Sequence, residues 1–304
     1  MKRLFIILLV LVSGLCFSKE VCAKVKVVTS TLDMADFVKE VGKNKVEVYA
    51  ISRGKVDLHF FEPRPSQVMK LNRADMLVIG GLDVDIWIKS MIDAARNPKI
   101  RFGSSGYVDP SDGICPVQIP RGRIDGSMGD VHPYGNPHFW FTPENVKIAV
   151  ENICEGLCRV SPSDCEYFER NRDEYIEKAN RTFEELRASM SPYAGAKVIQ
   201  YHQSWDYFCE TFDLEIVACL EPKPGISPSV SHLKKLVEQA RREDVKLLFV
   251  EPYYPEKPVG FVSKELKIEA LRLPLYLGSK EGIGNYLENL KYSVERIVEI
   301  LSKD

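Results

Sequence analysis

The sequence predicts an α/β protein of two lobes, each a parallel sheet flanked by helices, joined by one long helix. Short β-rich runs alternate with helical patterns in both halves of the chain, which is typical of parallel α/β sheets. A continuous helical pattern separates the halves. The length of 304 residues fits two domains better than one, although a single α/β barrel would also fit.

The N-terminus resembles a secretory signal. A basic head at residues 1–3 precedes an apolar run at 4–12, and Val21-Cys22-Ala23 offers small side chains to a signal peptidase. The apolar run is well short of the ~20 residues that span a bilayer. We therefore expect residues 1–23 to be removed and the protein to be exported, with periplasmic location favoured over attachment to the cell surface.

Lipoprotein processing is an alternative, because two cysteines lie in this leader. Cys16 follows Leu15 and Cys22 follows Val21, whereas a lipid-modified cysteine normally follows Gly, Ala or Ser. Cleavage after Ala23 is therefore the expectation.

The first lobe is expected over residues 24–160. Its strands are predicted at 25–29, 46–51, 76–79 and 100–102, with helices at 32–42, 65–73 and 84–95. Residues 103–137 are rich in Gly, Pro, Asp and Ser and predict a long irregular loop, which in compact domains is often functional. Thr142 and Pro143 then open a helix as cap and first residue.

The linking helix is expected over residues 161–190. Ser161-Pro162-Ser163-Asp164 resembles a capping box at its start, and Ser191-Pro192 ends it. A helix over 162–190 would be about 43 Å long at ~1.5 Å per residue, enough to brace two lobes.

The second lobe is expected over residues 191–304. Its strands are predicted at 197–201, 214–218, 246–250 and 268–273, with helices near 203–212, 227–242, 256–266 and 283–302.

Charge and cysteine content limit the function classes. Lys and Arg total 41 against 43 for Asp and Glu, with no basic run, so nothing indicates nucleic acid as a partner. The chain contains no CxxC motif, which argues against a cysteine zinc site. In an exported protein disulfides are the better interpretation, and Cys158 with Cys165 and Cys209 with Cys219 are the reasonable pairs.

The five histidines are the candidate functional residues. His59 follows the strand at 46–51 and His202 follows the strand at 197–201, where ligands of open α/β sheets gather. His138 precedes the helix capped by Thr142. Each histidine alone is more often a surface or core residue than a ligand, so these positions support a site between the lobes without proving it.

Four segments resemble the zinc/manganese-type solute-binding proteins of ABC importers, the cluster A-I periplasmic binding proteins. They are His59-Phe60-Phe61-Glu62-Pro63-Arg64-Pro65-Ser66, Ala74-Asp75-Met76-Leu77-Val78-Ile79-Gly80-Gly81-Leu82, Asn136-Pro137-His138-Phe139-Trp140 and Tyr201-His202-Gln203-Ser204-Trp205-Asp206. Matches continue at Phe249-Val250-Glu251-Pro252 and Gly284-Asn285-Tyr286, so the resemblance covers nearly the whole chain after the leader.

The resemblance implies a rigid linking helix, metal bound in the cleft and a membrane permease as partner. His59 and His138 of the first lobe and His202 of the second would be the ligands, each as neutral imidazole. The protein is expected to be a monomer. Glu62, Asp85 and Trp87 also match family positions and would be scaffold around the first ligand loop.

The chain departs from the family at the fourth ligand. Many members supply an aspartate where Arg272-Leu273-Pro274-Leu275 stands here, and Leu273 would take its place. Water, Glu251 or His132 could complete the site. A cleft-holding contact is the better interpretation of Glu251, a solvated side chain that of His132, and a helix-surface residue that of His232.

Three imidazoles favour zinc over manganese, which prefers more carboxylate oxygen. Copper, nickel or iron would also suit this donor set. A secreted zinc hydrolase with Glu251 as base is an alternative, although no nucleophile or oxyanion motif is present. A binding protein for a chelate and a surface adhesin are further alternatives.

Overall fold

The computed structural model describes residues 23–122, 129 and 131–303. The predicted signal peptide, apart from Ala23, lies outside these residues. No helix in the described part of the chain has the length and apolarity needed to cross a membrane.

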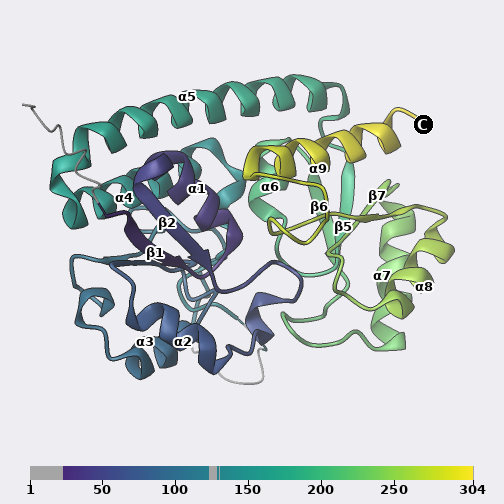
Figure 1. Ribbon diagram of the computed structural model, residues 1–304. Coiled ribbons are helices and arrows are strands. Elements are labelled where there is room, and N and C mark those ends of the chain that lie inside the picture. The colour runs from purple at the N-terminus through teal and green to yellow at the C-terminus, as the bar shows by residue number, and fades with distance from the viewer. Residues whose placement is uncertain (1–22, 123–128, 130, 304) are drawn as a thin grey trace, which may run out of the picture.

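Two four-stranded parallel sheets form the centres of two lobes (Figure 1). The first has the order β2-β1-β3-β4 and the second β6-β5-β7-β8. The strands are β1 Val25–Thr29, β2 Val46–Ala50, β3 Met76–Val78, β4 Tyr107–Val108, β5 Lys197–Gln200, β6 Glu215–Cys219, β7 Leu247–Val250 and β8 Ala270–Arg272. The predicted fold class, two such lobes joined by a long helix, is confirmed.

Helices cover both faces of each sheet. They are α1 Leu32–Gly42, α2 Pro65–Asn72, α3 Ile88–Ala95, α4 Pro143–Val160, α5 Cys165–Met190, α6 Asp206–Thr211, α7 Val230–Arg242, α8 Glu256–Leu266 and α9 Tyr286–Leu301. In the first lobe α1 and α4 lie on the side of α5, whereas α2 and α3 lie on the opposite side (Figure 1).

Alternate strand residues divide the core between the two sheet faces. Val27 and Val78 pack in the cluster that includes α1 and α4, whereas Val28 and Leu77 pack in the cluster that includes α2 and α3. The α5-side cluster continues without interruption into the second lobe, where Val198 and Phe249 belong to it. One apolar core therefore runs under α5 and through both lobes.

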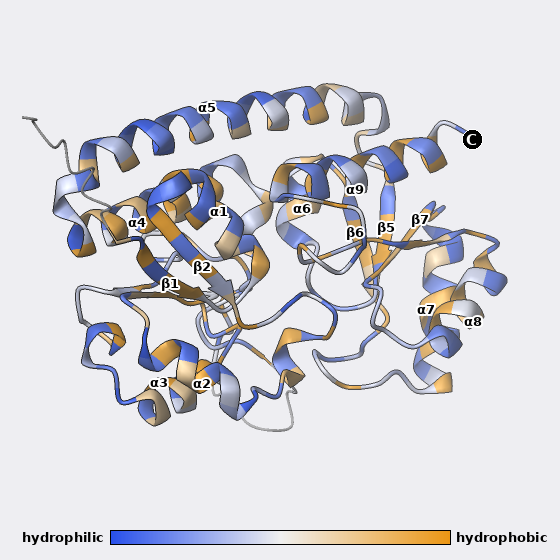
Figure 2. Cartoon of the chain, viewed as in Figure 1, coloured by the Kyte–Doolittle hydropathy of each residue, from blue (hydrophilic) through white to orange (hydrophobic). Residues whose placement is uncertain are grey.

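Helix α5 lies along this continuous core. It packs against α1 and α4 of the first lobe and α9 of the second. Its outer surface is hydrophilic and its inner residues are apolar, including Phe168, Tyr175 and Phe183 (Figure 2). A short 3-10 turn, Pro162–Asp164, precedes it, so the regular helix starts three residues later than the predicted start.

Hydrogen bonds also join the lobes directly. Asp33 of α1 accepts from the backbone N–H of Leu277 at 3.1 Å, and Asp36 accepts from that of Tyr286 at 2.9 Å. Gly54 has φ +71°, and a Cβ there would lie 2.4 Å from the carbonyl oxygen of Leu277. The two backbones approach too closely at this point for any other residue.

One predicted strand is wrong. Residues 100–102 do not form a strand, because Asn97 caps a 3-10 turn at Pro98–Ile100. The edge strand is β4, two residues long, inside the segment predicted to be irregular.

Candidate metal centre

Three histidines from separate loops meet at the cleft between the lobes. His59 lies in the 3-10 turn Leu58–Phe60 after β2, His138 precedes the turn Phe139–Phe141, and His202 follows β5. One ring nitrogen of each lies within 4.8 Å of the others. The structure thus brings together the three residues that were predicted to be ligands.

A carboxylate orients His59. Asp57 Oδ1 lies 2.7 Å from His59 Nδ1, and Tyr254 of the second lobe donates to Asp57 Oδ2 at 3.1 Å. Burial alone would raise the pKa of Asp57, but the hydrogen bond with His59 and the nearby imidazoles outweigh it and lower the pKa to about 2. The ionised Asp57 accepts the Nδ1 proton, which leaves the Nε2 lone pair of His59 directed into the site.

A second carboxylate orients His202. Glu221 Oε2 lies 2.7 Å from His202 Nδ1 and also accepts the backbone N–H of Gly225 at 3.0 Å. Burial opposes protonation of His202, but the hydrogen bond and negative charge of Glu221 dominate and raise its pKa. His202 therefore also presents Nε2 to the site.

His138 is buried and its ring lacks hydrogen-bond partners. Its exposed fraction is 0%, and among the described residues neither ring nitrogen has a partner. The backbone N–H of His138 is held by Asn136 Oδ1 at 3.0 Å. Burial, with the neighbouring histidines, lowers its pKa well below the ordinary value, so the ring is neutral. A buried imidazole without a partner is costly unless something else occupies its lone pair.

His132 belongs to this site, so its expected solvated position is wrong. Its Nε2 lies 2.8 Å from Nε2 of His59, and the side chain is only partly exposed. Burial and the charges of His59 and His202 lower the pKa of His132 to about 3. A lone histidine in a Gly- and Pro-rich loop carries no periodic signal that would have placed it here.

Leu273 is fully buried in the core shared by the lobes, and its backbone N–H donates to the carbonyl oxygen of Val250 at 2.9 Å. Tyr276, three residues later in the same loop, has its ring 6.4 Å from the ring of His138. That Leu273 takes the place of the family's aspartate stays a prediction.

Glu251 is held within the second lobe. Its Oε1 accepts hydrogen bonds from the Ser204 hydroxyl and from Trp205 Nε1, the latter at 3.1 Å. Burial raises the pKa of Glu251 to about 7, although the Ser204 hydrogen bond opposes this. Its other oxygen, Oε2, is buried without a hydrogen-bond partner among the described residues. Because the side-chain contacts all lie within the second lobe, the role of Glu251 in holding the cleft stays a prediction.

Of the three residues expected to support the first ligand loop, two make structural hydrogen bonds and one is exposed. Trp87 Nε1 donates to the carbonyl oxygen of Leu58 at 3.1 Å, and Asp85 accepts the Gly80 N–H at 2.6 Å. Glu62 is instead exposed. His232 lies on α7, half-buried, with Nε2 3.3 Å from the Cys219 carbonyl oxygen.

One of the two expected disulfides is present. Cys158 at the end of α4 is bonded to Cys165 at the start of α5. Cys209 and Cys219 are free, so that expected pair is wrong. Cys209 is buried in the core on α6, whereas the Cys219 thiol donates to the carbonyl oxygen of Tyr201 at 3.0 Å.

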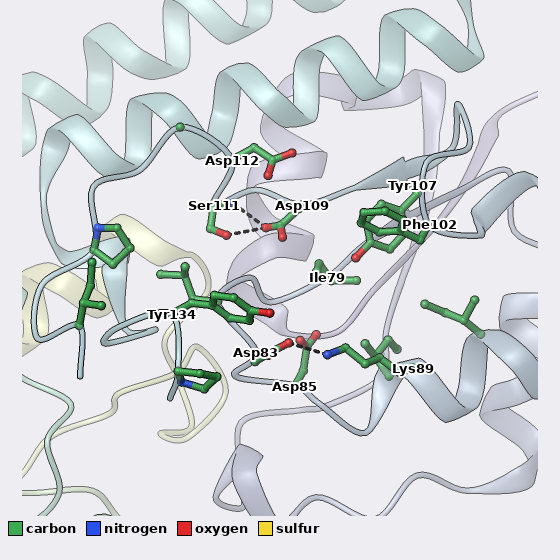
Figure 3. A pocket seen from close by; sticks show the side chains of 17 residues that line it. Ile79, Asp83, Asp85, Lys89, Phe102, Tyr107, Asp109, Ser111, Asp112 and Tyr134 are labelled. Atoms are coloured by element: carbon green, nitrogen blue, oxygen red, sulfur yellow. Dashed lines mark hydrogen bonds and ion pairs between the residues drawn. The ribbon is translucent and has the colours of Figure 1, made fainter. Parts of the chain in front are cut away.

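A separate cavity of about 570 Å³ lies in the first lobe beside α3 (Figure 3). Its walls combine apolar side chains with carboxylates, of which Asp83 pairs with Lys89 at 2.8 Å. Pro133 and Tyr134, which directly follow His132, line one side. Among the described residues its lining contains no histidine, so it is distinct from the histidine cluster.

The described geometry suits a soft or borderline divalent cation. Three imidazole nitrogens converge, and two of the rings have their outer nitrogen oriented by a carboxylate, an arrangement common at zinc sites. Sequence reasoning missed Asp57 and Glu221. Their signals were available: Asp57 is two residues from His59, and Glu221 follows β6, the strand next to β5, which precedes His202.

One protein family and several solved structures of metal-binding proteins match this chain. The family model described as the periplasmic component A of the zinc-uptake complex, ZnuA, matches residues 27–300. A crystal structure of ZnuA superposes with a TM-score of 0.77 at 23% identity, covering 91% of this chain and 99% of that one. A Mn-bound periplasmic metal-binding protein from Candidatus Liberibacter asiaticus gives 0.75 at 23% identity, covering 91% and 100%.

Two curated relatives match over most of their length. A putative metal-binding protein from Treponema pallidum is 25% identical, covering 92% of this chain and 88% of that protein. The manganese ABC transporter substrate-binding lipoprotein PsaA from Streptococcus pneumoniae is 26% identical, covering 94% and 92%. Because the family model matches nearly the whole chain after the leader, the resemblance is confirmed, and the protein belongs to the ZnuA family of periplasmic zinc-uptake components.

Proposed function

We propose that this protein is the extracytoplasmic substrate-binding component of an ABC importer for a divalent transition metal, most directly zinc. His59, His138 and His202 bind the ion in the cleft, and the loaded protein delivers it to a membrane permease. Family membership and the names of the relatives support the class of transporter.

The observation that carries the proposal is the unpartnered ring of His138 within a histidine cluster. Its ring is fully buried with neither nitrogen hydrogen-bonded to a described residue, while nitrogens of His59 and His202 lie within 4.8 Å. Burying such a group without compensation costs roughly 1–3 kcal/mol. A bound cation would use the lone pair and remove that cost.

The donor set favours zinc over manganese. All three converging atoms are imidazole nitrogens, which zinc accepts readily, whereas manganese prefers carboxylate oxygen. Two carboxylates beside the cluster, those of Asp57 and Glu221, are hydrogen-bonded to the outer nitrogens of His59 and His202. Relatives named for manganese keep that metal as the second choice.

The proposed function includes export from the cytoplasm and a two-lobed monomer. Residues 1–23 direct export to the periplasm, and the mature protein acts as a monomer. Residues 24–160 and 191–304 form the two lobes, with residues 161–190 as the brace between them. Because the hydrogen bonds of Asp33 and Asp36 join the lobes, a small adjustment at the cleft is favoured over wide opening.

Competition titration against zinc and manganese chelators tests the proposal, with metal analysis of the purified protein. We expect one zinc per chain, tighter binding of zinc than of manganese, and loss of binding in His138→Ala. His232→Ala is the matched control and should bind normally. Failure of the parent protein to bind either metal stoichiometrically would overturn the proposal.

A further inference from the structure

Building on the proposed function, we propose that His132 is the fourth protein ligand of the bound metal. It leaves its hydrogen bond with His59 when the ion enters and coordinates the ion through Nε2. The completed site then has four imidazoles.

The contact between His59 and His132 joins two nitrogen atoms at nearly the distance that separates two ligands of one metal ion. Their Nε2 atoms are 2.8 Å apart, and Asp57 holds the opposite nitrogen of His59. With Nδ1 of His59 donating to Asp57, Nε2 of His59 is the acceptor and His132 donates its Nε2–H. The lone pair of His59 Nε2, which the metal would need, is therefore occupied by the hydrogen bond from His132.

An incoming ion must displace this hydrogen bond. Two nitrogens on one tetrahedral zinc, each at ~2.0–2.1 Å, lie about 3.3 Å apart. The two Nε2 atoms thus separate by roughly half an ångström, and His132 also swings off the axis of the His59 lone pair, where the ion takes its place. Its proton passes from Nε2 to Nδ1 through solvent, so the imidazole stays neutral and no net proton is lost.

The backbone around His132 is anchored on the second lobe. A Cβ on Gly129 would lie 2.1 Å from the carbonyl oxygen of Pro224 in the second lobe, so the two backbones are in close contact. On the other side, Asn136 Nδ2 donates to the carbonyl oxygen of Gln203, and its own carbonyl accepts from Tyr207. These contacts hold His132 over the mouth of the site.

Space for the movement exists beside His202. A cavity of about 50 Å³ is lined by both His132 and His202, together with Gln118, Val131 and Asn136. That volume exceeds the ~10–15 Å³ that one water needs. The imidazole can therefore turn from His59 toward the ion without displacing either lobe.

The other candidates for the fourth position are Leu273 and Glu251. Leu273 is in the core. Glu251 keeps Oε1 on Ser204 and Trp205, and its buried Oε2 has no hydrogen-bond partner among the described residues. Among these side chains, His132 alone is in direct contact with a member of the cluster.

X-ray absorption at the zinc edge tests the proposal by counting imidazoles. We expect four for the parent protein and for the control His232→Gln, and three plus one oxygen for His132→Gln. Glutamine can still donate a hydrogen bond to His59, so it preserves the metal-free arrangement while removing the ligand. Competition titration should show zinc binding weakened roughly tenfold or more.

The outcomes separate this proposal from the broader one. A three-imidazole shell in the zinc-loaded parent protein, or tighter zinc binding by His132→Gln, would overturn the role of His132 and leave the transport function standing. Absence of stoichiometric zinc in the parent protein would overturn the proposed function itself. Unfolding of the metal-free His132→Gln variant by urea should match the parent.

Discussion

The carboxylate of Glu221 lies 2.7 Å from Nδ1 of His202, and both side chains are buried. This pair fixes the orientation of the imidazole and makes it more basic, because the negative charge favours the ring that donates to it. Asp57 does the same for His59 in the other lobe. The site therefore has one carboxylate–histidine pair on each side of the cleft, and the ring of His138 lies 5.8 Å from the ring of each of these histidines.

Glu221→Gln should weaken zinc binding by about 10–100-fold, because the amide keeps the shape of the side chain but loses the charge that orients and polarises His202. Competition titration measures the change. Glu256→Gln removes an exposed carboxylate paired with Arg272 and serves as the control. Equal affinities of the two variants would show that Glu221 has no influence on the metal.

His59→Ala, His138→Ala and His202→Ala should each weaken zinc binding more than Glu221→Gln does, since each removes a proposed ligand rather than its support. His232→Ala should have little effect, because His232 lies on α7 against Cys219. Titration of the four variants under one set of conditions makes the comparison. The ligand assignment fails if His232→Ala is as damaging as the other three.

Zinc should raise the melting temperature less as the pH falls. Metal and proton compete for the same imidazoles, and the raised pKa of His202 means that its protonation begins above the ordinary value of about 6.5. The zinc-induced increment is therefore largest at alkaline pH and declines through neutral to mildly acidic pH. His138, with its lowered pKa, competes only in stronger acid.

Thermal melts with and without zinc at several pH values measure this increment. The difference between the two melts isolates the site, because other titrating groups contribute to both. A zinc-induced shift that is the same at mildly acidic and mildly alkaline pH would argue against a histidine site.

Much of the fold follows from local patterns. The helix over residues 256–266 has the predicted bounds, because its apolar periodicity and the chain reversal after it are both clear. Strand β4 was missed because only Tyr107 and Val108 form it, within a segment rich in turn residues. Two residues cannot show an alternation, so only the neighbouring strand β3 defines them as a strand.

The site was predictable only in part. Motif resemblance placed His59, His138 and His202, which lie far apart in sequence and meet only because parallel strands end at one edge of each sheet. Nothing local indicated His132, since its position depends on a loop that crosses between the lobes. The alignment of Leu273 with the family's aspartate stays a prediction, because it rests on a short loop in which a shift of a few residues would change the side chain that faces the cleft.

Leu273→Asp should destabilise the metal-free protein and should not tighten zinc binding. Leu273 has no exposed surface and packs in the core that joins the lobes, so the variant loses apolar packing and buries a carboxyl group. Truncating a buried leucine typically costs about 2–5 kcal/mol, and an unpaired buried polar group adds to this. We expect the urea midpoint of the metal-free variant to fall accordingly. Val230→Asp, a change of an exposed apolar residue on α7, is the matched control and should unfold like the parent. A stable Leu273→Asp protein with tighter zinc binding would show that residue 273 faces the metal, contrary to its position in the core.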